Sequence, residues 1–126
     1  MNPETQLLRQ AHPQFVTNGQ ITSQVFFPFP KDDGLLSVDD GDQVTAEVAY
    51  QNYTGNLGLK SCGVWAVTKA EADGQNVPAI ASPGLNRPSH SSIDFRLKSE
   101  KDSRKIAKKL KAFAVAKGCL YAPPPA

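Results

Sequence analysis

Apolar and polar side chains alternate over residues 20–27, where Ile21 and Val25 are separated by polar positions. The β-branched and aromatic residues of this segment favour extended backbone, so it is predicted to be a strand. Pro28 ends the pattern, because proline cannot donate the backbone hydrogen bond that a sheet requires. The Thr-Asn-Gly sequence at 17–19 is typical of a turn and predicts one before the strand.

Residues 99–117 show the periodicity of an amphipathic helix. Apolar side chains recur there at helical spacing, at Ile106, Leu110, Phe113 and Ala114. Ser99 is a favourable N-cap, and Gly118 is a favourable residue just after the last turn. The pattern predicts one longer, amphipathic C-terminal helix whose polar face is basic.

Two short helices are expected earlier in the chain. The first is predicted to start after Asp42, as its N-cap, and to end at Gly55. The second is predicted to start at Thr68, because Glu71 follows three residues later and completes a capping box.

Further strands are predicted over residues 35–38, 58–67, 91–95 and 119–121. Strands and helices alternate without a regular βαβ repeat, so the fold class is expected to be α+β with a mainly antiparallel sheet. We expect one compact domain over residues 1–126, with loose termini at 1–6 and 122–126.

Composition narrows the class of protein further. The chain has 126 residues, of which 40% are hydrophobic and 21% are charged, as in a globular protein of one domain. No apolar stretch approaches the length of a membrane helix, and no signal peptide is evident at the start. A cytoplasmic location with no membrane partner is therefore expected. Cys62 and Cys119 lack metal-ligand spacing and are predicted to be small buried residues.

Charge is distributed unevenly along the chain. Residues 1–95 carry a balance of −5 and residues 96–126 a balance of +7, which together give the net charge of +2. The basic C-terminal helix makes nucleic-acid contact through residues 96–117 an open alternative. The candidates for contact with phosphate or an acidic partner are Arg104, Lys105, Lys108, Lys109 and Lys111.

Candidate chemistry is sparse in this sequence. No phosphate-binding loop, dinucleotide fingerprint, zinc-protease motif or nucleophile elbow is found, and no cofactor or metal is predicted. The remaining candidates for a catalytic or binding role are polar residues beside predicted strands and loops: Arg9, His12, Ser23, Ser37 and His90. Histidine can act as a general base near neutral pH, so these residues would form a site if they met in one cleft.

The segments LLRQAHPQFV, GQITSQVFFP, GLLSVDDG, CGVWAVT and NRPSHSSIDF carry a resemblance that covers about residues 7–118. Over these segments the chain resembles a group of small bacterial proteins with no established activity. The resemblance implies a compact cytoplasmic bacterial domain and transfers no catalytic residue. The segment RQAHPQFVTNGQITS also resembles ADP-ribosyltransferase-like folds. That resemblance implies Arg9 and His12 as NAD-contacting candidates, although Pro13 departs from its pattern.

Three hypotheses of function follow. The first is an interaction protein of a bacterial accessory system, such as a toxin–antitoxin, phage-defence or mobile-element system, which binds a protein partner. The second is a small nucleotide- or NAD-handling enzyme or toxin. The third is non-specific nucleic-acid binding through the basic C-terminal helix. The first is the main expectation, because the chain is one small domain without a catalytic signature.

Overall fold

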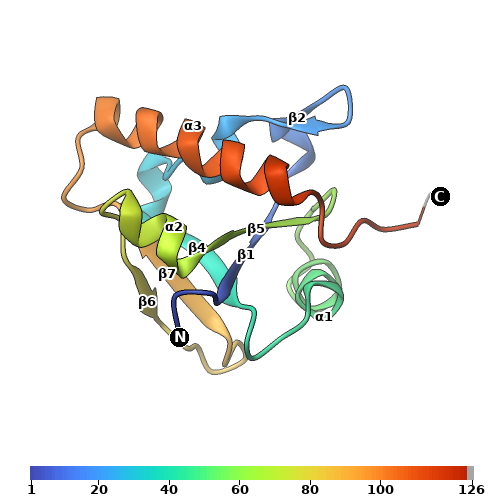
Figure 1. The fold of residues 1–126 in the computed structure, drawn as a ribbon. Coiled ribbons are helices and arrows are strands. Elements are labelled where there is room, and N and C mark those ends of the chain that lie inside the picture. The colour runs from blue at the N-terminus through green and yellow to red at the C-terminus, as the bar shows by residue number, and fades with distance from the viewer. Residues whose placement is uncertain (125–126) are drawn as a thin grey trace.

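The computed structural model describes residues 1–124 and has a five-stranded antiparallel sheet at its centre (Figure 1). The strand order is β5-β1-β4-β7-β6. The strands are β1 (Gln6–Gln10), β4 (Leu35–Asp40), β5 (Val64–Thr68), β6 (Ala79–Ala81) and β7 (His90–Asp94). A separate hairpin joins β2 (Val16–Thr17) to β3 (Gln20–Ile21). The predicted α+β class, with its antiparallel sheet, is confirmed.

The helices are α1 (Ala46–Gln51), α2 (Lys69–Gly74) and α3 (Glu100–Lys117). The predicted caps of α3 are confirmed, since the Ser99 side chain accepts from the Asp102 amide and Gly118 takes a φ of 88°. The capping box of Thr68 and Glu71 is confirmed at α2. Asp42 is not the cap of α1. Thr45 is the cap instead, because its hydroxyl accepts from the Val48 amide.

The predicted strand over 20–27 is wrong beyond its first two residues. Ser23–Phe26 forms a 3-10 helix, η2, which packs beneath α3 and buries both Val25 and Phe26 completely. A strand would send these consecutive side chains to opposite faces, whereas the tight turn directs both into the core. The predicted turn before it is confirmed, since Asn18 and Gly19 have φ values of 53° and 76°.

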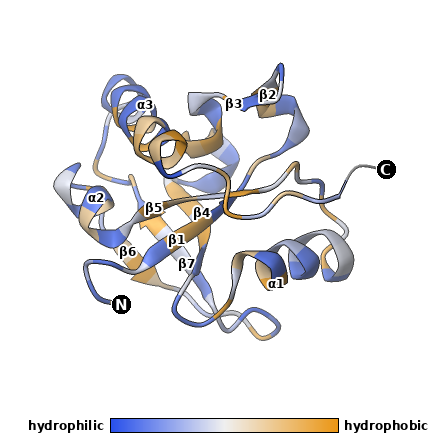
Figure 2. Cartoon of the chain, turned by 45° about the vertical axis from the view of Figure 1, so that its right-hand side comes forward, coloured by the Kyte–Doolittle hydropathy of each residue, from blue (hydrophilic) through white to orange (hydrophobic). Residues whose placement is uncertain are grey.

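The two faces of the sheet are covered by different elements (Figure 2). α3 and η2 cover the first face, where Leu7, Leu36 and Ile93 belong to the main hydrophobic core. α1 covers part of the second face, where Leu8, Val64 and Ala66 form a smaller core with Ala49. Side chains alternate between the faces along each strand, so β1 contributes to both cores.

Two residues of the expected loose terminus 1–6 belong to the folded part of the chain. Thr5 is buried, its carbonyl oxygen accepts from the Lys69 amide, and Gln6 already belongs to β1. At the other end, Tyr121 bridges to Val64, in the region of the predicted strand 119–121. Of the segment 122–126, residues 125–126 lie outside the described residues.

Two further expectations concern the cysteines and the membrane. Cys62 is half-buried and Cys119 is exposed, so the prediction of two buried cysteines is wrong. Neither cysteine lies within a strand, contrary to the strands predicted over 58–67 and 119–121. The strand predicted over 58–67 begins only at Val64, so Cys62 precedes it. Within residues 1–124, no helix combines the length and the apolar character that crossing a membrane requires.

Candidate functional site

A gap opens in the middle of the sheet where β1 and β4 diverge. β1 pairs with β5 along all five of its residues, but with β4 only at Leu7–Asp40 and Leu8–Asp39. A continued register would pair Arg9 with Val38 and Gln10 with Ser37. The strands separate instead, so the side chains of Arg9 and Gln10 stand at an opening in the sheet.

The Arg9 guanidinium occupies this gap. Its Nε atom donates to the Val25 carbonyl oxygen at 2.7 Å, and its Nη1 atom donates to the Ser37 carbonyl oxygen at 2.9 Å. No carboxylate within residues 1–124 forms an ion pair with Arg9, and its Nη2 atom makes no hydrogen bond to these residues. Burial lowers the pKa of Arg9, against smaller opposing effects of Tyr53 and Asp32. Arg9 is therefore a fixed cation that forms no ion pair within residues 1–124, although the Asp32 carboxylate is near enough to favour its charged form.

Arg9 lines a cavity of about 230 Å³, which we call the Arg9 cavity. Its wall also includes Gln10, His12, Ser37, Tyr53 and Arg87. Gln10 is 7% exposed, and its Oε1 atom accepts from the Ser61 hydroxyl at 2.8 Å. Its Nε2 atom is buried without a partner in residues 1–124. If the Gln10 amide were turned over, its oxygen would take the place of the nitrogen and would be the atom without a partner. In either orientation one polar atom of the amide can accept a further hydrogen bond or donate one.

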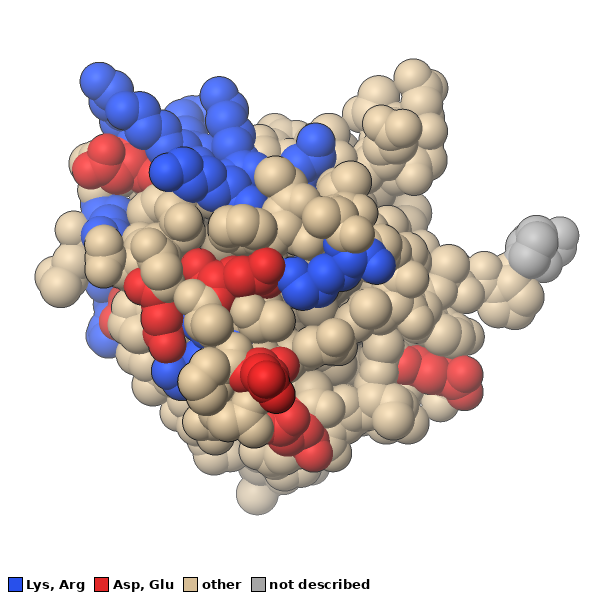
Figure 3. Space-filling view, in the orientation of Figure 1, with Lys and Arg blue, Asp and Glu red and all other residues tan. Residues whose placement is uncertain are grey.

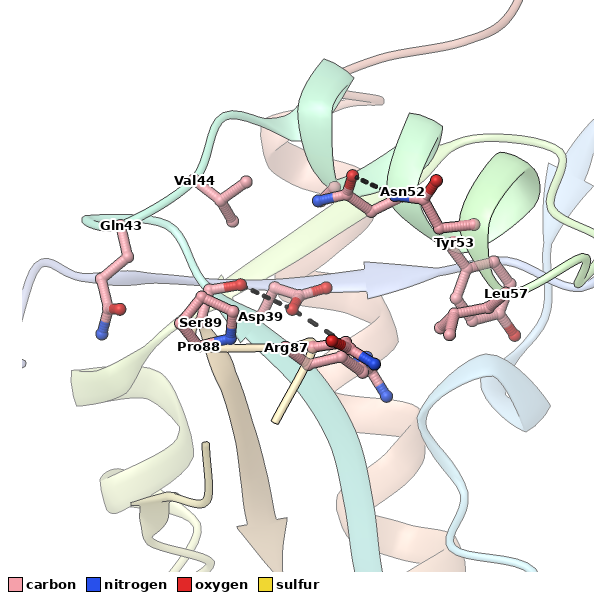
Figure 4. A pocket seen from close by; sticks show the side chains of 12 residues that line it. Asp39, Gln43, Val44, Asn52, Tyr53, Leu57, Arg87, Pro88 and Ser89 are labelled. Atoms are coloured by element: carbon pink, nitrogen blue, oxygen red, sulfur yellow. Dashed lines mark hydrogen bonds and ion pairs between the residues drawn. The ribbon is translucent and has the colours of Figure 1, made fainter. Parts of the chain in front are cut away.

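A larger hollow of about 520 Å³ adjoins the Arg9 cavity, and we call it the α1 groove. The two spaces share Asp39, Tyr53 and Arg87 as wall residues. The groove runs between the loop at 86–89 and the segment that continues α1 as a π-helical turn, Asn52–Asn56. Figure 4 shows Asn52 and Tyr53 on this segment, across from Asp39 and Arg87.

Two interactions fix the floor of the α1 groove. The Ser89 hydroxyl donates to Asp39 at 3.0 Å, and an Arg87 nitrogen lies 3.9 Å from the same carboxylate oxygen (Figure 4). The Arg87–Asp39 distance is long for an ion pair, so Arg87 is only loosely held. The amides of Asn52 and Asn56 bond to each other at 3.0 Å on the opposite wall. The groove therefore combines amide groups, one aromatic ring and one adjustable cation.

His90 and Ser37 form a direct contact at the sheet. His90 on β7 lies opposite Asp39 of β4, diagonal to Ser37 on the same face. Its Nε2 atom lies 3.1 Å from the Ser37 hydroxyl oxygen, and its Nδ1 atom lies 2.9 Å from the Ser82 carbonyl oxygen. The Ser82 hydroxyl oxygen also lies 2.9 Å from Nδ1. In the tautomer with the proton on Nδ1, this atom donates to the carbonyl and Nε2 accepts from Ser37.

The structure brings some of the sequence candidates together and separates others. Arg9, His12 and Ser37 line one cavity, and His90 reaches that cavity through Ser37. His12 also caps the short 3-10 helix Pro13–Phe15, because its Nδ1 atom accepts from the Gln14 amide at 3.0 Å. Ser23 does not belong to this cavity. It begins η2 and lines a hollow beside Lys108 of α3.

The basic residues of α3 gather on one surface (Figure 3). Lys105, Lys108 and Lys109 are exposed and form no ion pair within residues 1–124. Arg104 differs from them, since it donates to Glu100 at 2.9 Å and lies 5.2 Å over the Phe27 ring. Lys111 is half-buried at the hollow beside the β2–β3 hairpin.

Sequence reasoning missed Gln10, Asp39, Tyr53 and Arg87. Gln10 and Asp39 could have been found, because each is a polar residue in a strand of mainly buried residues. A buried polar residue needs a partner or a role, so such a position is a candidate for a site. Tyr53 and Arg87 gave no comparable signal, because they lie in segments whose path depends on tertiary packing. Nothing in residues 1–124 forms a group of three or more metal-binding side chains.

Comparisons with protein families, with curated proteins and with solved structures found no match for this chain. The site is therefore interpreted from its own geometry.

Proposed function

We propose that the protein binds a small phosphorylated molecule of nucleotide size in the Arg9 cavity and the α1 groove. The observation that carries this proposal is the Arg9 guanidinium, which lines the cavity without a carboxylate partner in residues 1–124. Arg9 is half-buried, and moving a charge out of water is unfavourable unless an opposite charge compensates it. A bound anion supplies that counter-charge.

Donor groups around the cavity favour phosphate as the anion. Arg9 offers its Nη2 atom, Arg87 is held only loosely by Asp39, and Gln10 has a buried Nε2 atom without a partner among residues 1–124. Arginine has no acceptor, so the two cationic groups match a ligand group that accepts several hydrogen bonds. A phosphate group has three terminal oxygens and meets this requirement better than a hydroxyl or an amide.

The α1 groove supports a ligand that is larger than phosphate alone. Its volume of about 520 Å³ lies within the range of small-molecule sites. Asn52, Asn56 and Asn86 line it with groups that both donate and accept, as the edges of a nucleobase or the hydroxyls of a sugar require. Tyr53 adds an aromatic ring at the junction with the Arg9 cavity.

Side-chain NMR tests this proposal on the intact chain. The probes are inorganic phosphate, adenosine monophosphate and adenosine, followed at the Arg9 Nε–H and Gln10 amide signals. Phosphate and the nucleotide should shift these signals, and adenosine should shift Asn52 and Asn56 more weakly.

Arg87→Ala should weaken nucleotide binding about tenfold, the effect of losing one charge-assisted hydrogen bond. Arg96→Ala, an exposed arginine on a different surface, is the matched control. Unchanged Arg9 and Gln10 signals at saturating phosphate and nucleotide would reject the proposal.

Nucleic-acid binding by α3 is a second candidate. It is favoured by Lys105, Lys108 and Lys109, which are exposed and form no ion pair with the described residues 1–124. It predicts an affinity for single-stranded DNA that falls steeply with salt, because bound counterions are released. The triple variant with glutamine at these positions should abolish binding, whereas Lys69→Gln on α2 should not. Binding that does not change with salt would reject this candidate.

The other hypotheses stay predictions. These are the protein partner within a toxin–antitoxin, phage-defence or mobile-element system, the cytoplasmic location and the relationship to small bacterial proteins. The nucleotide-handling hypothesis is the one that the Arg9 cavity supports.

A further inference from the structure

We propose that Ser37 is a nucleophile activated by His90, and that the protein hydrolyses a carboxylic ester carried by a phosphorylated molecule. This inference rests on the proposed function for the class of substrate, and on the Ser37–His90 geometry for the chemistry.

The contact between Ser37 and His90 has the arrangement that general-base activation requires. The Ser37 hydroxyl oxygen lies 3.1 Å from Nε2 of His90. Nδ1 of His90 lies 2.9 Å from both the carbonyl and the hydroxyl oxygen of Ser82, which together hold the ring in this orientation. In the tautomer with the proton on Nδ1, the lone pair of Nε2 points toward the Ser37 hydroxyl. A nucleophile, a base and a group that orients the base are the three elements of serine hydrolysis.

Ser37 is also accessible from the ligand site. It is half-buried and lines the Arg9 cavity, whose wall also contains His12 and Tyr53. The Arg9 Nη1 atom donates to the Ser37 carbonyl oxygen at 2.9 Å, so a positive charge lies at the backbone of this residue. This charge favours the anionic part of a substrate and also the negative charge that develops on the attacked carbonyl oxygen.

The reaction proceeds in two steps. In the first step the Ser37 hydroxyl oxygen bonds to the ester carbonyl carbon, its proton passes to Nε2 of His90, and the carbonyl π electrons move to oxygen. Collapse of this intermediate breaks the bond to the alcohol, which leaves with the proton from His90. In the second step His90 takes a proton from water, the hydroxide attacks the acyl-serine, and the carboxylic acid leaves as Ser37 regains its proton.

A purely structural role would have a different consequence. Ser37, Ser82, Ser92 and His90 form a connected network of hydrogen bonds on the second face of the sheet. If these bonds served only to satisfy polar groups, Ser37 would react no faster than an ordinary serine.

Covalent labelling of the intact protein tests the inference. A fluorophosphonate reagent, detected by intact-mass and peptide mass spectrometry, should form one adduct at Ser37. Labelling should be lost in Ser37→Ala and fall at least about a hundredfold in His90→Gln, since base catalysis contributes roughly this factor. Ser92→Ala is the matched control. It removes a hydroxyl that contacts Ser82 but not the histidine, so it should keep its labelling rate. Circular dichroism of each variant confirms that it is folded.

The outcomes separate this inference from the proposed function. No adduct at Ser37 in the wild-type protein, or an adduct that forms equally fast in His90→Gln, would overturn the Ser37–His90 assignment. An adduct that depends on His90 and forms more slowly with adenosine monophosphate present supports both proposals. An adduct that depends on His90 but is unaffected by the nucleotide would support Ser37 as the nucleophile and reject a phosphorylated molecule as the substrate.

Discussion

The two faces of the sheet use the same strands for different purposes. On the first face, alternate residues such as Leu7, Leu36 and Val38 are buried beneath α3 and η2. On the second face, their neighbours Ser37 and Asp39 are polar and border the Arg9 cavity and the α1 groove. The first face is a closed hydrophobic layer, whereas the second holds polar groups at an opening in the sheet. A short alternating strand can therefore contribute to a core on one face and line a polar cavity on the other.

The largest effect is expected from the closed face. Leu110 of α3 is completely buried in the main core. Leu110→Ala should lower the free energy of unfolding by about 2–5 kcal/mol through lost burial and the cavity left behind. Val115→Ala on the same helix is the control, since Val115 is 50% exposed and its loss should cost at most about 0.5 kcal/mol. Urea denaturation measures both variants, and equal effects would contradict the assignment of Leu110 to the core.

Replacing Arg9 should change ligand affinity much more than the free energy of unfolding. Arg9→Met removes a half-buried charge but leaves the carbonyl oxygens of Val25 and Ser37 without this donor. These two effects oppose each other, so the net change in stability should be about 1–3 kcal/mol at most. Affinity for adenosine monophosphate should fall about a hundredfold or more, because the counter-charge of the ligand is lost. Calorimetry of binding and urea denaturation measure the two quantities. Unchanged affinity in a folded Arg9→Met variant would remove Arg9 from the site.

The N-caps of α1 and α3 allow the two faces of the sheet to be compared by matched substitutions. Thr45 caps α1 beside the groove, and Ser99 caps α3 over the closed face. Thr45→Ala and Ser99→Ala should each cost about 1 kcal/mol, the usual value of an N-cap. Only Thr45→Ala should also weaken ligand binding, because it loosens the wall that includes Asn52 and Tyr53. Amide hydrogen exchange and ligand titration test this, and equal loss of affinity in both variants would contradict a local role for α1.

The smallest effect is expected at the edge of the second face. Arg96 donates to Asp94 at 2.9 Å, and these hydrogen bonds lower the pKa of Asp94 below its ordinary value of 3.8. The ionised carboxylate therefore stabilises the fold above about pH 4, and this contribution is lost as pH falls through the lowered pKa. Arg96→Ala should reduce the fall in melting temperature between about pH 4 and pH 2, and high salt should reduce the difference because Arg96 is exposed. Identical acid profiles for the two proteins would contradict the ion pair.

The local signals in the sequence were sufficient for α3, for the capping box at Thr68 and for the turn at Asn18. Each depends on contacts within a few residues, so the spacing of side chains carries the information. The strand predicted over 20–27 failed because η2 packs under α3, a helix more than seventy residues away in the chain. Tertiary packing decided that segment against its local propensity.

The sequence by itself determined the α+β class, the amphipathic α3 and the polar character of Arg9, His12, Ser37 and His90. Only the tertiary structure decided that Ser37 meets His90, that Ser23 lies elsewhere, and that Arg87 and Tyr53 join the site. The physical reason is that these contacts depend on the register between β4 and β7 and on the separation of β1 from β4. Strand register is set by the packing of both faces at once, and a one-residue shift would turn Ser37 away from His90.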